Sequence, residues 1–360
     1  MASRLSALII VGAMIGARAQ NAPKEIILVE ANAVSQASAA KWKEEKFKGV
    51  AIVLDEPGDR TLRRAAGAIA AAELDLYWWI EVGRNPKMAA ANPRWMASLG
   101  MHADWQKRFP NAPEPGVNQV AKAFPWVPIA YAEAFDAHLK RIEELCKDLP
   151  PGAQGLFLND LQAGPGSCGC GNVQCRWAVD YHVSPTTRKM TGTNVAGRFV
   201  AEARKRTNLP IVPVWTSECE ESDMPSDKNR GKPSTGLCGS VGCATGACPM
   251  EFAGQLSELL SAHEGPVALL AVHNPLERTR EQFGGGPTWV INALGYVHKT
   301  LAAEGRKPFP KERLWAVVDG TDAGNEGTAR EAAARAGATT VIVARTAIDQ
   351  SYEPRLLRKE

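Results

Sequence analysis

Eight short apolar runs divide the chain into a regular series. Each run is four to seven residues long, rich in Val, Ile, Leu or aromatic residues and free of polar alternation, which is typical of strands buried on both faces of a parallel sheet. The runs span residues 26–29, 49–54, 74–80, 155–159, 211–215, 267–272, 314–318 and 339–344. With helices between them they form successive right-handed βαβ units, so the pattern predicts a (β/α)8 barrel, also called a TIM barrel.

The segments between the runs have the composition of helices. Helices are expected over residues 33–46, 60–73, 133–147, 194–206, 251–263, 288–304 and 325–336. Two connections are far longer than a barrel requires: residues 82–132 contain prolines and tryptophans, and residues 218–249 contain four cysteines. Both leave the C-terminal ends of strands, where loops build the site of a barrel. The charged tail, 352–360, is expected to cap the bottom of the barrel or to fray.

Length and charge narrow the function. A minimal barrel takes about 250 residues, so a single barrel domain with long loops over residues 20–360 accounts for the chain of 360 residues. The formal net charge is only +3 and no basic run stands out, which argues against a nucleic-acid surface. We therefore expect a carbohydrate or another small neutral substrate, and we make no prediction of the oligomeric state.

The first 19 residues have the pattern of a secretory signal peptide. Arg4 provides the positive start, residues 5–17 are apolar, and Ala-Arg-Ala at 17–19 provides a cleavage site with small residues. The apolar stretch is shorter than the roughly 20 residues that span a bilayer, and no other segment approaches that length. We expect a secreted or periplasmic protein without a membrane span.

The chain contains eight cysteines, and seven of them fall in two of the expected loops. These seven are Cys168, Cys170 and Cys175 after the fourth run, and Cys219, Cys238, Cys243 and Cys248 after the fifth. In an oxidising compartment such a cluster most often forms disulfides that staple long loops. Seven is odd, so either one thiol stays free, or Cys146 from a predicted helix joins the set, or some cysteines bind metal.

A zinc site is the alternative interpretation of these cysteines. Cys168, Cys170 and Cys175 offer three thiolates, and Cys219 or another cysteine of the second loop would complete a tetrahedral site. Structural zinc sites usually contain paired CxxC units, from which this spacing differs. An iron–sulfur cluster is less favoured, because a chain exported unfolded would have to acquire it outside the cytoplasm. Apart from these metals, no cofactor is expected.

Acidic residues follow several of the runs and would lie together on the rim of a barrel. Hydrolysis of a glycosidic bond needs two facing carboxyl groups, one to protonate the leaving oxygen and one to attack carbon or activate water. Asp160 is the first candidate, because it follows the fourth strand and is expected to point into the mouth with Asn159 beside it. Glu218 or Asp319 would be its partner, and Glu81 is the next candidate. Any one of these acids could instead cap a helix or pair with an arginine.

Aromatic and polar residues near the same rim are expected to bind the substrate. Sugar rings stack on indole faces, and aromatic side chains are common in binding sites. The candidates for substrate binding are Trp95, Trp105 and Trp126 in the long loop, with Asp55, His273 and Arg345 at strand ends. Each also has a structural interpretation, as an anchor of the loop, a polar rim contact or a member of an ion pair.

The fourth run and the segment after it carry a resemblance to a known group of proteins. The run 155–159 ends before Asp160 and leads to Cys168-Gly-Cys170-Gly-Asn-Val-Gln-Cys175-Arg-Trp-Ala. In these residues the chain resembles secreted barrel proteins related to glycoside hydrolases, which often have a CxCxxC-type segment after strand four. This chain has four residues between Cys170 and Cys175, where that pattern has two. The resemblance implies the barrel fold and assigns no catalytic pair.

Three hypotheses of function follow. The leading one is a secreted glycoside hydrolase-like barrel that acts on carbohydrate through paired carboxylates. The second is a non-catalytic glycan-binding barrel, in which the rim acids serve the structure. The third is an exported protein whose thiol cluster is a redox, zinc or iron–sulfur centre.

Overall fold

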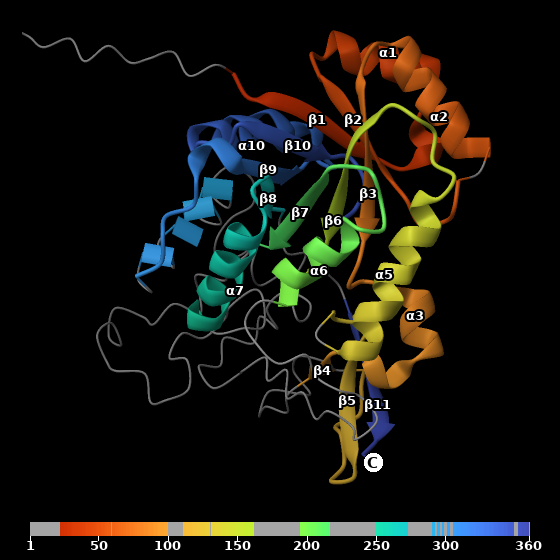
Figure 1. Ribbon diagram of the computed structural model, residues 1–360, viewed down its shortest axis with the longest axis vertical. Helices are drawn as coiled ribbons and strands as arrows, with labels where there is room; N and C mark the ends of the chain where they lie inside the picture. Colours follow the sequence, from red (N-terminus) through yellow and green to blue (C-terminus); the bar gives the residue numbers. More distant parts are fainter. Residues whose placement is uncertain are drawn as a thin grey trace, which may run out of the picture.

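The computed structural model describes most of the chain (Figure 1). The described residues are 22–58, 60–99, 111–129, 131–161, 195–216, 249–272, parts of 290–302, 305–348 and 352–359. Within them lie a barrel of parallel strands, the helices that surround it, and a small second sheet below the barrel in Figure 1.

Eight parallel strands close into the barrel. They are β1 (Lys24–Val29), β2 (Gly49–Val53), β3 (Asp75–Glu81), β6 (Ala153–Asn159), β7 (Ile211–Thr216), β8 (Val267–Leu270), β9 (Leu314–Asp319) and β10 (Thr340–Ala344). The order around the ring is β1-β10-β9-β8-β7-β6-β3-β2. Barrel strands that follow one another along the chain are therefore paired with each other, and the last strand, β10, pairs with the first, β1. This confirms the predicted (β/α)8 barrel.

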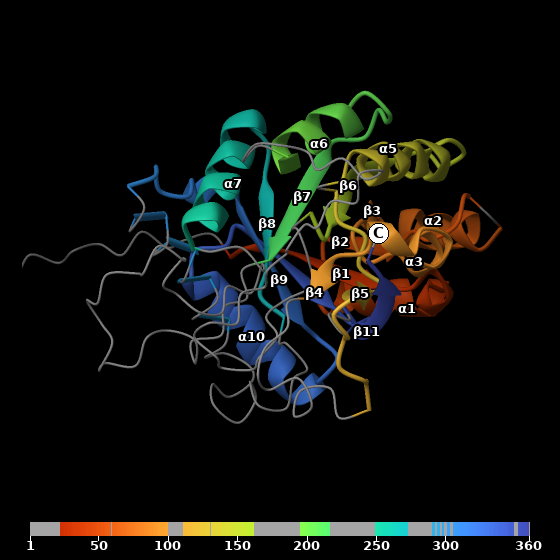
Figure 2. The same ribbon diagram turned by 90° about the horizontal axis from the view of Figure 1, so that it is seen from below.

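Helices surround these strands, as the view from below shows (Figure 2). They are α1 (Gln36–Glu44), α2 (Arg60–Ala71), α5 (Ala132–Cys146), α6 (Val195–Ala203), α7 (Pro249–Ala262) and α10 (Ala323–Arg335), with the short α3 (Pro86–Ala91) after β3. Capping side chains mark where two of these helices begin. Ser35 and Ser38 form a capping box at the start of α1, and Asp322 accepts a hydrogen bond from the N–H of Gly324 at the start of α10.

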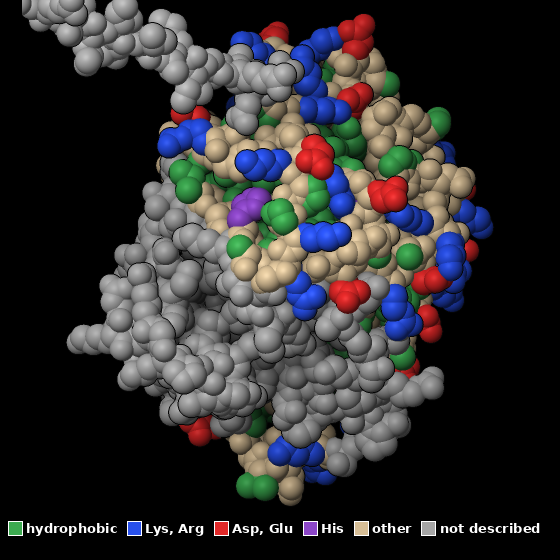
Figure 3. All heavy atoms as spheres, turned by 60° about the vertical axis from the view of Figure 1, so that its left-hand side comes forward, with side chains coloured by type: hydrophobic (Ala, Val, Ile, Leu, Met, Phe, Trp, Pro, Cys, Tyr) green, Lys and Arg blue, Asp and Glu red, His purple; other side chains and the backbone are tan. Residues whose placement is uncertain are grey.

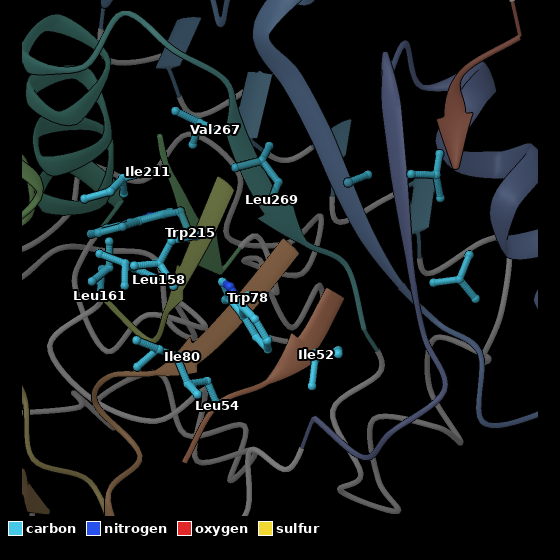
Figure 4. Packing of buried hydrophobic residues seen from close by; sticks show 14 of the residues in the cluster. Ile52, Leu54, Trp78, Ile80, Leu158, Leu161, Ile211, Trp215, Val267 and Leu269 are labelled. Atoms are coloured by element: carbon cyan, nitrogen blue, oxygen red, sulfur yellow. The ribbon is translucent and has the colours of Figure 1, made fainter. Parts of the chain in front are cut away.

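Alternate residues of the strands fill two separate layers of the core. One set points into the barrel, where the rings of Trp79 and Phe157 lie 5.4 Å apart. The other set points outward and packs against side chains of the helices. Figure 4 shows Trp78, Ile80 and Leu158 among the residues of this cluster. Strands buried on both faces account for the continuous apolar runs of the sequence.

A three-stranded antiparallel sheet lies outside the barrel, and the sequence did not predict it. Its strands are β4 (Ser98–Leu99), β5 (Gln119–Phe124) and β11 (Glu353–Arg358), in the order β11-β5-β4. The charged tail that was expected to cap the barrel bottom or to fray thus forms β11, with Glu353 paired to Phe124. The connections that contain these strands leave the C-terminal ends of β3 and β10, so the small sheet lies on the side of the barrel mouth (Figure 1).

The surface of the described part carries charges of both signs. Figure 3 shows Lys and Arg side chains mixed with Asp and Glu over the face that it displays. Of the helices in the described residues, none combines the length and the apolar character needed to cross a bilayer.

Candidate functional site

Three carboxylates occupy one layer at the C-terminal mouth of the barrel. The apolar cluster inside the barrel includes Leu28, Trp79 and Val317. Two residues further along the chain stand Glu30, which directly follows β1, and Glu81 and Asp319, which are the last residues of β3 and β9. Alternate residues of a strand face the same way, and alternate strands of the ring, such as β1, β3 and β9, supply one layer of a (β/α)8 barrel. The three acids therefore face the mouth together.

Glu81 and Asp319 come from opposite sides of this mouth. Their strands, β3 and β9, are separated by four steps around the ring in either direction. Both residues are the last of their strands and both are half-buried. The structure thus places two of the four predicted catalytic acids at the ends of opposite strands of the barrel.

Both carboxylate oxygens of Glu81 are held by hydrogen bonds. The indole Nε1 of Trp79 donates to Oε1 across 2.7 Å, and the side-chain amide of Asn159 donates to Oε2 across 2.7 Å. Trp79 is two residues earlier on β3, and Asn159 is the register partner of Glu81 on β6. Both donor side chains are fully buried. The carboxylate is therefore fixed at the boundary between the packed interior and the mouth, as a nucleophile or a general acid or base requires.

The carboxylate of Asp319 is held on one oxygen. The backbone N–H and the hydroxyl of Thr321 donate to Oδ1 across 2.8 and 2.7 Å. This is a local turn of the kind that Asp commonly makes with the chain two residues on. Oδ2 takes part in neither bond.

Glu30 is a mouth residue that the list of candidates from the sequence did not include. Its Oε1 accepts a hydrogen bond of 2.8 Å from the hydroxyl of Thr346, which follows the adjacent strand β10. The side chain of Glu30 is exposed. The signal was present in the sequence, because Glu30 directly follows the apolar run 26–29, as Glu81 follows the run 74–80.

Asp160 lies beside the mouth with its side chain buried. It has no exposed surface, and its backbone is in the left-handed region with φ of 59°. Asn159 takes the inward position instead, because it lies two residues after the inward-facing Phe157. The alternation of inward and outward side chains along a strand could have predicted from the sequence that Asn159, and not Asp160, points into the mouth. A catalytic role for Asp160 stays a prediction, and the described geometry favours Glu81.

The segment that leads from β5 to α5 binds the rim beside Glu81. Val127 donates its N–H to the carbonyl of Gly83 across 2.7 Å, and Asn85 donates to the carbonyl of Pro125 across 3.0 Å. Gly83 is also in close contact with Asp160, since a Cβ added there would lie 2.7 Å from the Asp160 carbonyl oxygen. The small sheet is thereby joined to the barrel rim at the end of β3.

The tryptophans expected as sugar platforms are packed in this region. Trp126 is 1% exposed, so its indole offers no open face to a sugar ring. Trp95 is half-buried against a small apolar cluster that includes Met96 and Tyr131. Trp126 is therefore a packing residue, which corrects the expectation that it binds a sugar ring. Packing also covers most of the surface of Trp95. Asp55 is exposed at the end of β2, with its Oδ1 3.7 Å from the guanidinium of Arg141.

Arg345 lies in the outer layer of the barrel. Its guanidinium pairs with Glu45 across 2.7 Å and with Glu326 across 2.8 Å, and it lies 5.3 Å from the ring centroid of Phe47. The hydrogen bond to Glu326 and next the one to Glu45 raise the pKa of Arg345, although burial disfavours its charged form. These contacts join α1, α10 and β10 and give Arg345 a structural role, and its role in substrate binding stays a prediction.

The remaining candidates lie outside the described residues. They are Glu218, Trp105, His273, Cys168, Cys170, Cys175, Cys219, Cys238, Cys243 and Cys248. Among the residues that the structure does describe, no group of three His, Cys, Asp or Glu side chains is placed to hold a metal ion.

Comparisons with known proteins add similarity of fold alone. No family model and no curated protein matches the chain. Solved structures do match, among them the HpcH/HpaI aldolase from Desulfitobacterium hafniense, at 10% identity and a TM-score of 0.33 over 89% of this chain and 86% of that one. A beta-galactosidase from the psychrophilic Marinomonas ef1 matches at 11% identity and a TM-score of 0.44 over 89% of this chain and 53% of that one. Alpha-L-fucosidase isoenzyme 2 from Paenibacillus thiaminolyticus matches at 11% identity and a TM-score of 0.42 over 89% of this chain and 45% of that one.

The chain therefore spans about half the length of these two glycosidases. At such identities no residue and no activity can be transferred from any of the three proteins.

Proposed function

We propose that the protein is a barrel enzyme that hydrolyses a glycosidic bond, with Glu81 and Asp319 as its two carboxyl groups. The observation that carries this proposal is the fixed carboxylate of Glu81, which accepts hydrogen bonds from Trp79 and Asn159 at the inner rim. Asp319 stands on the opposite strand of the same layer. One group would protonate the leaving oxygen, and the other would attack the anomeric carbon or activate a water molecule.

An oligosaccharide panel tests this proposal. The mature chain, residues 20–360, is assayed beside Glu81→Gln, Asp319→Asn and Asp160→Asn, each checked for folding by circular dichroism. We expect the first two substitutions to reduce turnover by at least about a thousandfold, because each removes a group that reacts directly. Turnover that survives Glu81→Gln would contradict the assignment, and glycan binding without turnover in the unmodified chain would favour a non-catalytic binding protein.

We also propose that the protein is exported and that its loop cysteines form disulfides, without a resident cofactor. The signal-like pattern over residues 1–19 and the density of cysteines in the loops support this proposal. N-terminal sequencing of the exported protein and elemental analysis test it. An intact Met1 on the protein recovered from the cell, or bound zinc or iron with reduced thiols, would contradict it.

A further inference from the structure

The backbone carbonyl of Glu81 lies where the ladder between β2 and β3 ends. The N–H of Leu54 donates to the carbonyl of Trp79 across 2.8 Å. In a parallel ladder the next bond would join the N–H of residue 56 to the carbonyl of Glu81, but β2 has ended by then. Nη1 of Arg141, from helix α5, donates to this carbonyl across 2.8 Å. A side chain thus takes the place of the missing backbone donor.

The guanidinium of Arg141 is held between the ends of β2 and β3. Its side chain is only 20% exposed, and Nη2 lies 3.7 Å from Oδ1 of Asp55. Burial lowers the pKa of Arg141, while the nearby acids Asp55, Glu81 and Glu56 oppose this effect. A guanidinium remains charged even so, and Arg141 therefore places a fixed positive charge behind the main chain of Glu81.

Helix α5 contacts the same rim at a second point. His138 precedes Arg141 by three residues, so both side chains lie on one face of the helix. Nε2 of His138 donates to the carbonyl of Val127 across 2.8 Å, and the N–H of Val127 donates to the carbonyl of Gly83 across 2.7 Å. The backbone is thus fixed at Glu81 and again two residues later.

We propose that Arg141 is a positioning residue that fixes the main chain of Glu81, so that its carboxylate stays on Trp79 and Asn159. The proposal rests on the proposed function in taking Glu81 as a catalytic carboxylate. The two bonds of 2.7 Å to that carboxylate require a fixed Cα position, and a carbonyl without its donor would turn toward another partner or toward water.

The indole N–H signal of Trp79 in 15N-tryptophan-labelled protein reports this position directly, and Glu81→Ala assigns it. We expect Arg141→Met to shift the signal and Arg141→Lys, which retains a donor and the charge, to restore it in part. Lys140→Met is the matched control, since Lys140 is the neighbouring cation and its side chain is 77% exposed. It should leave the signal unchanged, and the signals of Trp42 and Trp215 should stay in place in all variants.

Kinetics provide the second measurement. We expect Arg141→Met to lower kcat about a hundredfold with a much smaller change in KM, because a displaced catalytic group costs about that much. An unchanged Trp79 signal, or an unchanged kcat in a folded Arg141→Met protein, would overturn the positioning role. If Arg141→Met does not fold, Arg141→Gln takes its place with the same expected results. An unmodified chain without turnover would overturn the proposed function instead, and the Trp79 signal alone would then decide the role of Arg141.

Discussion

The side-chain amide of Asn159 donates a hydrogen bond of 2.7 Å to Oε2 of Glu81, a residue 78 positions earlier in the chain. The two residues are register partners on the adjacent strands β6 and β3. The amide has no exposed surface of note, whereas the carboxylate reaches the mouth. The bond therefore links the packed interior of the barrel to its proposed catalytic group.

Replacing Asn159 with Asp is expected to destabilise the protein in a pH-dependent way. The substitution keeps the shape of the side chain, removes the N–H donor and brings two carboxyl groups within hydrogen-bond distance. Two ionised carboxylates so close repel each other. We expect the free energy of unfolding to fall by about 1–3 kcal/mol at pH 7 and by less at pH 4, where one group can hold a proton. Denaturant titrations at the two pH values measure both changes.

The matched control for this substitution is Asn208→Asp, which adds the same charge at an exposed position. A surface change of this kind usually alters stability by no more than about 0.5 kcal/mol. Equal stability of the two variants at pH 7 would mean that the bond between Asn159 and Glu81 contributes nothing measurable.

Gly83 allows two parts of the rim to approach each other. A Cβ at this position would lie 2.7 Å from the carbonyl oxygen of Asp160, and backbone atoms cannot move away freely. We expect Gly83→Ala to cost about 1–3 kcal/mol, as overpacking does. Gly67→Ala is the control, because a Cβ inside helix α2 at that position meets no atom within 4 Å, and alanine should stabilise the helix by up to about 1 kcal/mol. Thermal denaturation that ranks the two variants in the opposite order would contradict the close approach.

The barrel was predictable from the sequence because burial on both faces is visible within each strand. The run 267–272, for example, needs no distant partner to be recognised as β8. Strand β5 gives no such signal. Lys122 interrupts its apolar pattern, and it is tolerated because its Nζ donates to the carbonyl of Met96 across 2.9 Å. Burial, and next the charge of Arg94, lower the pKa of Lys122 to about 8. Strand β5 is stabilised by pairing with β11, which lies far along the chain and cannot be recognised from the local sequence pattern.

The candidate site was predictable only in part. Glu81 and Asp319 could be found because the ends of barrel strands meet at one rim. The fixed orientation of Glu81 could not be found, because it depends on Asn159 and Arg141, which lie far away in the sequence. The ion pairs of Arg345 could not be predicted either. Its position at a strand end is like that of a site residue, but its partners belong to the outer helices.

The buried imidazole of His138 predicts a loss of stability in mild acid. Burial lowers its pKa from 6.5 to about 4, since the bond to Val127 only partly offsets desolvation. The unfolded chain therefore takes up the proton first as the pH falls below about 6.5, and stability is lost progressively down to about pH 4. This group alone should lower the free energy of unfolding by about 2 kcal/mol between pH 7 and pH 5.

Denaturant titrations of the unmodified chain and of His138→Gln measure this contribution. The glutamine amide can still donate to the carbonyl of Val127 and does not titrate. We expect the variant to lose less stability between pH 7 and pH 5, with some loss remaining because burial also lowers the pKa of His263 to about 4. Identical pH dependence of the two proteins would contradict the role of His138.

The thiol of Cys146 should react slowly in the folded protein. It is half-buried at the end of α5 and forms no disulfide. Burial raises its pKa, against the smaller opposing effect of a hydrogen bond with Thr207. Because the thiolate is the reactive form, we expect a chromogenic thiol reagent at pH 8 to modify Cys146 more slowly than a free thiol by at least about tenfold, with Cys146→Ser as the control. An equal rate would contradict the burial.

The number of free thiols after unfolding without reductant separates the interpretations of the other cysteines. The chain has eight cysteines, and with Cys146 unpaired the remaining seven cannot all pair within one chain. If the loops hold only internal disulfides, we expect at least two reactive thiols per unfolded chain. A single reactive thiol would require a disulfide to a second molecule, which a non-reducing gel would reveal as a dimer. Eight reactive thiols would contradict the disulfides, and zinc or iron released on unfolding would then support a metal centre.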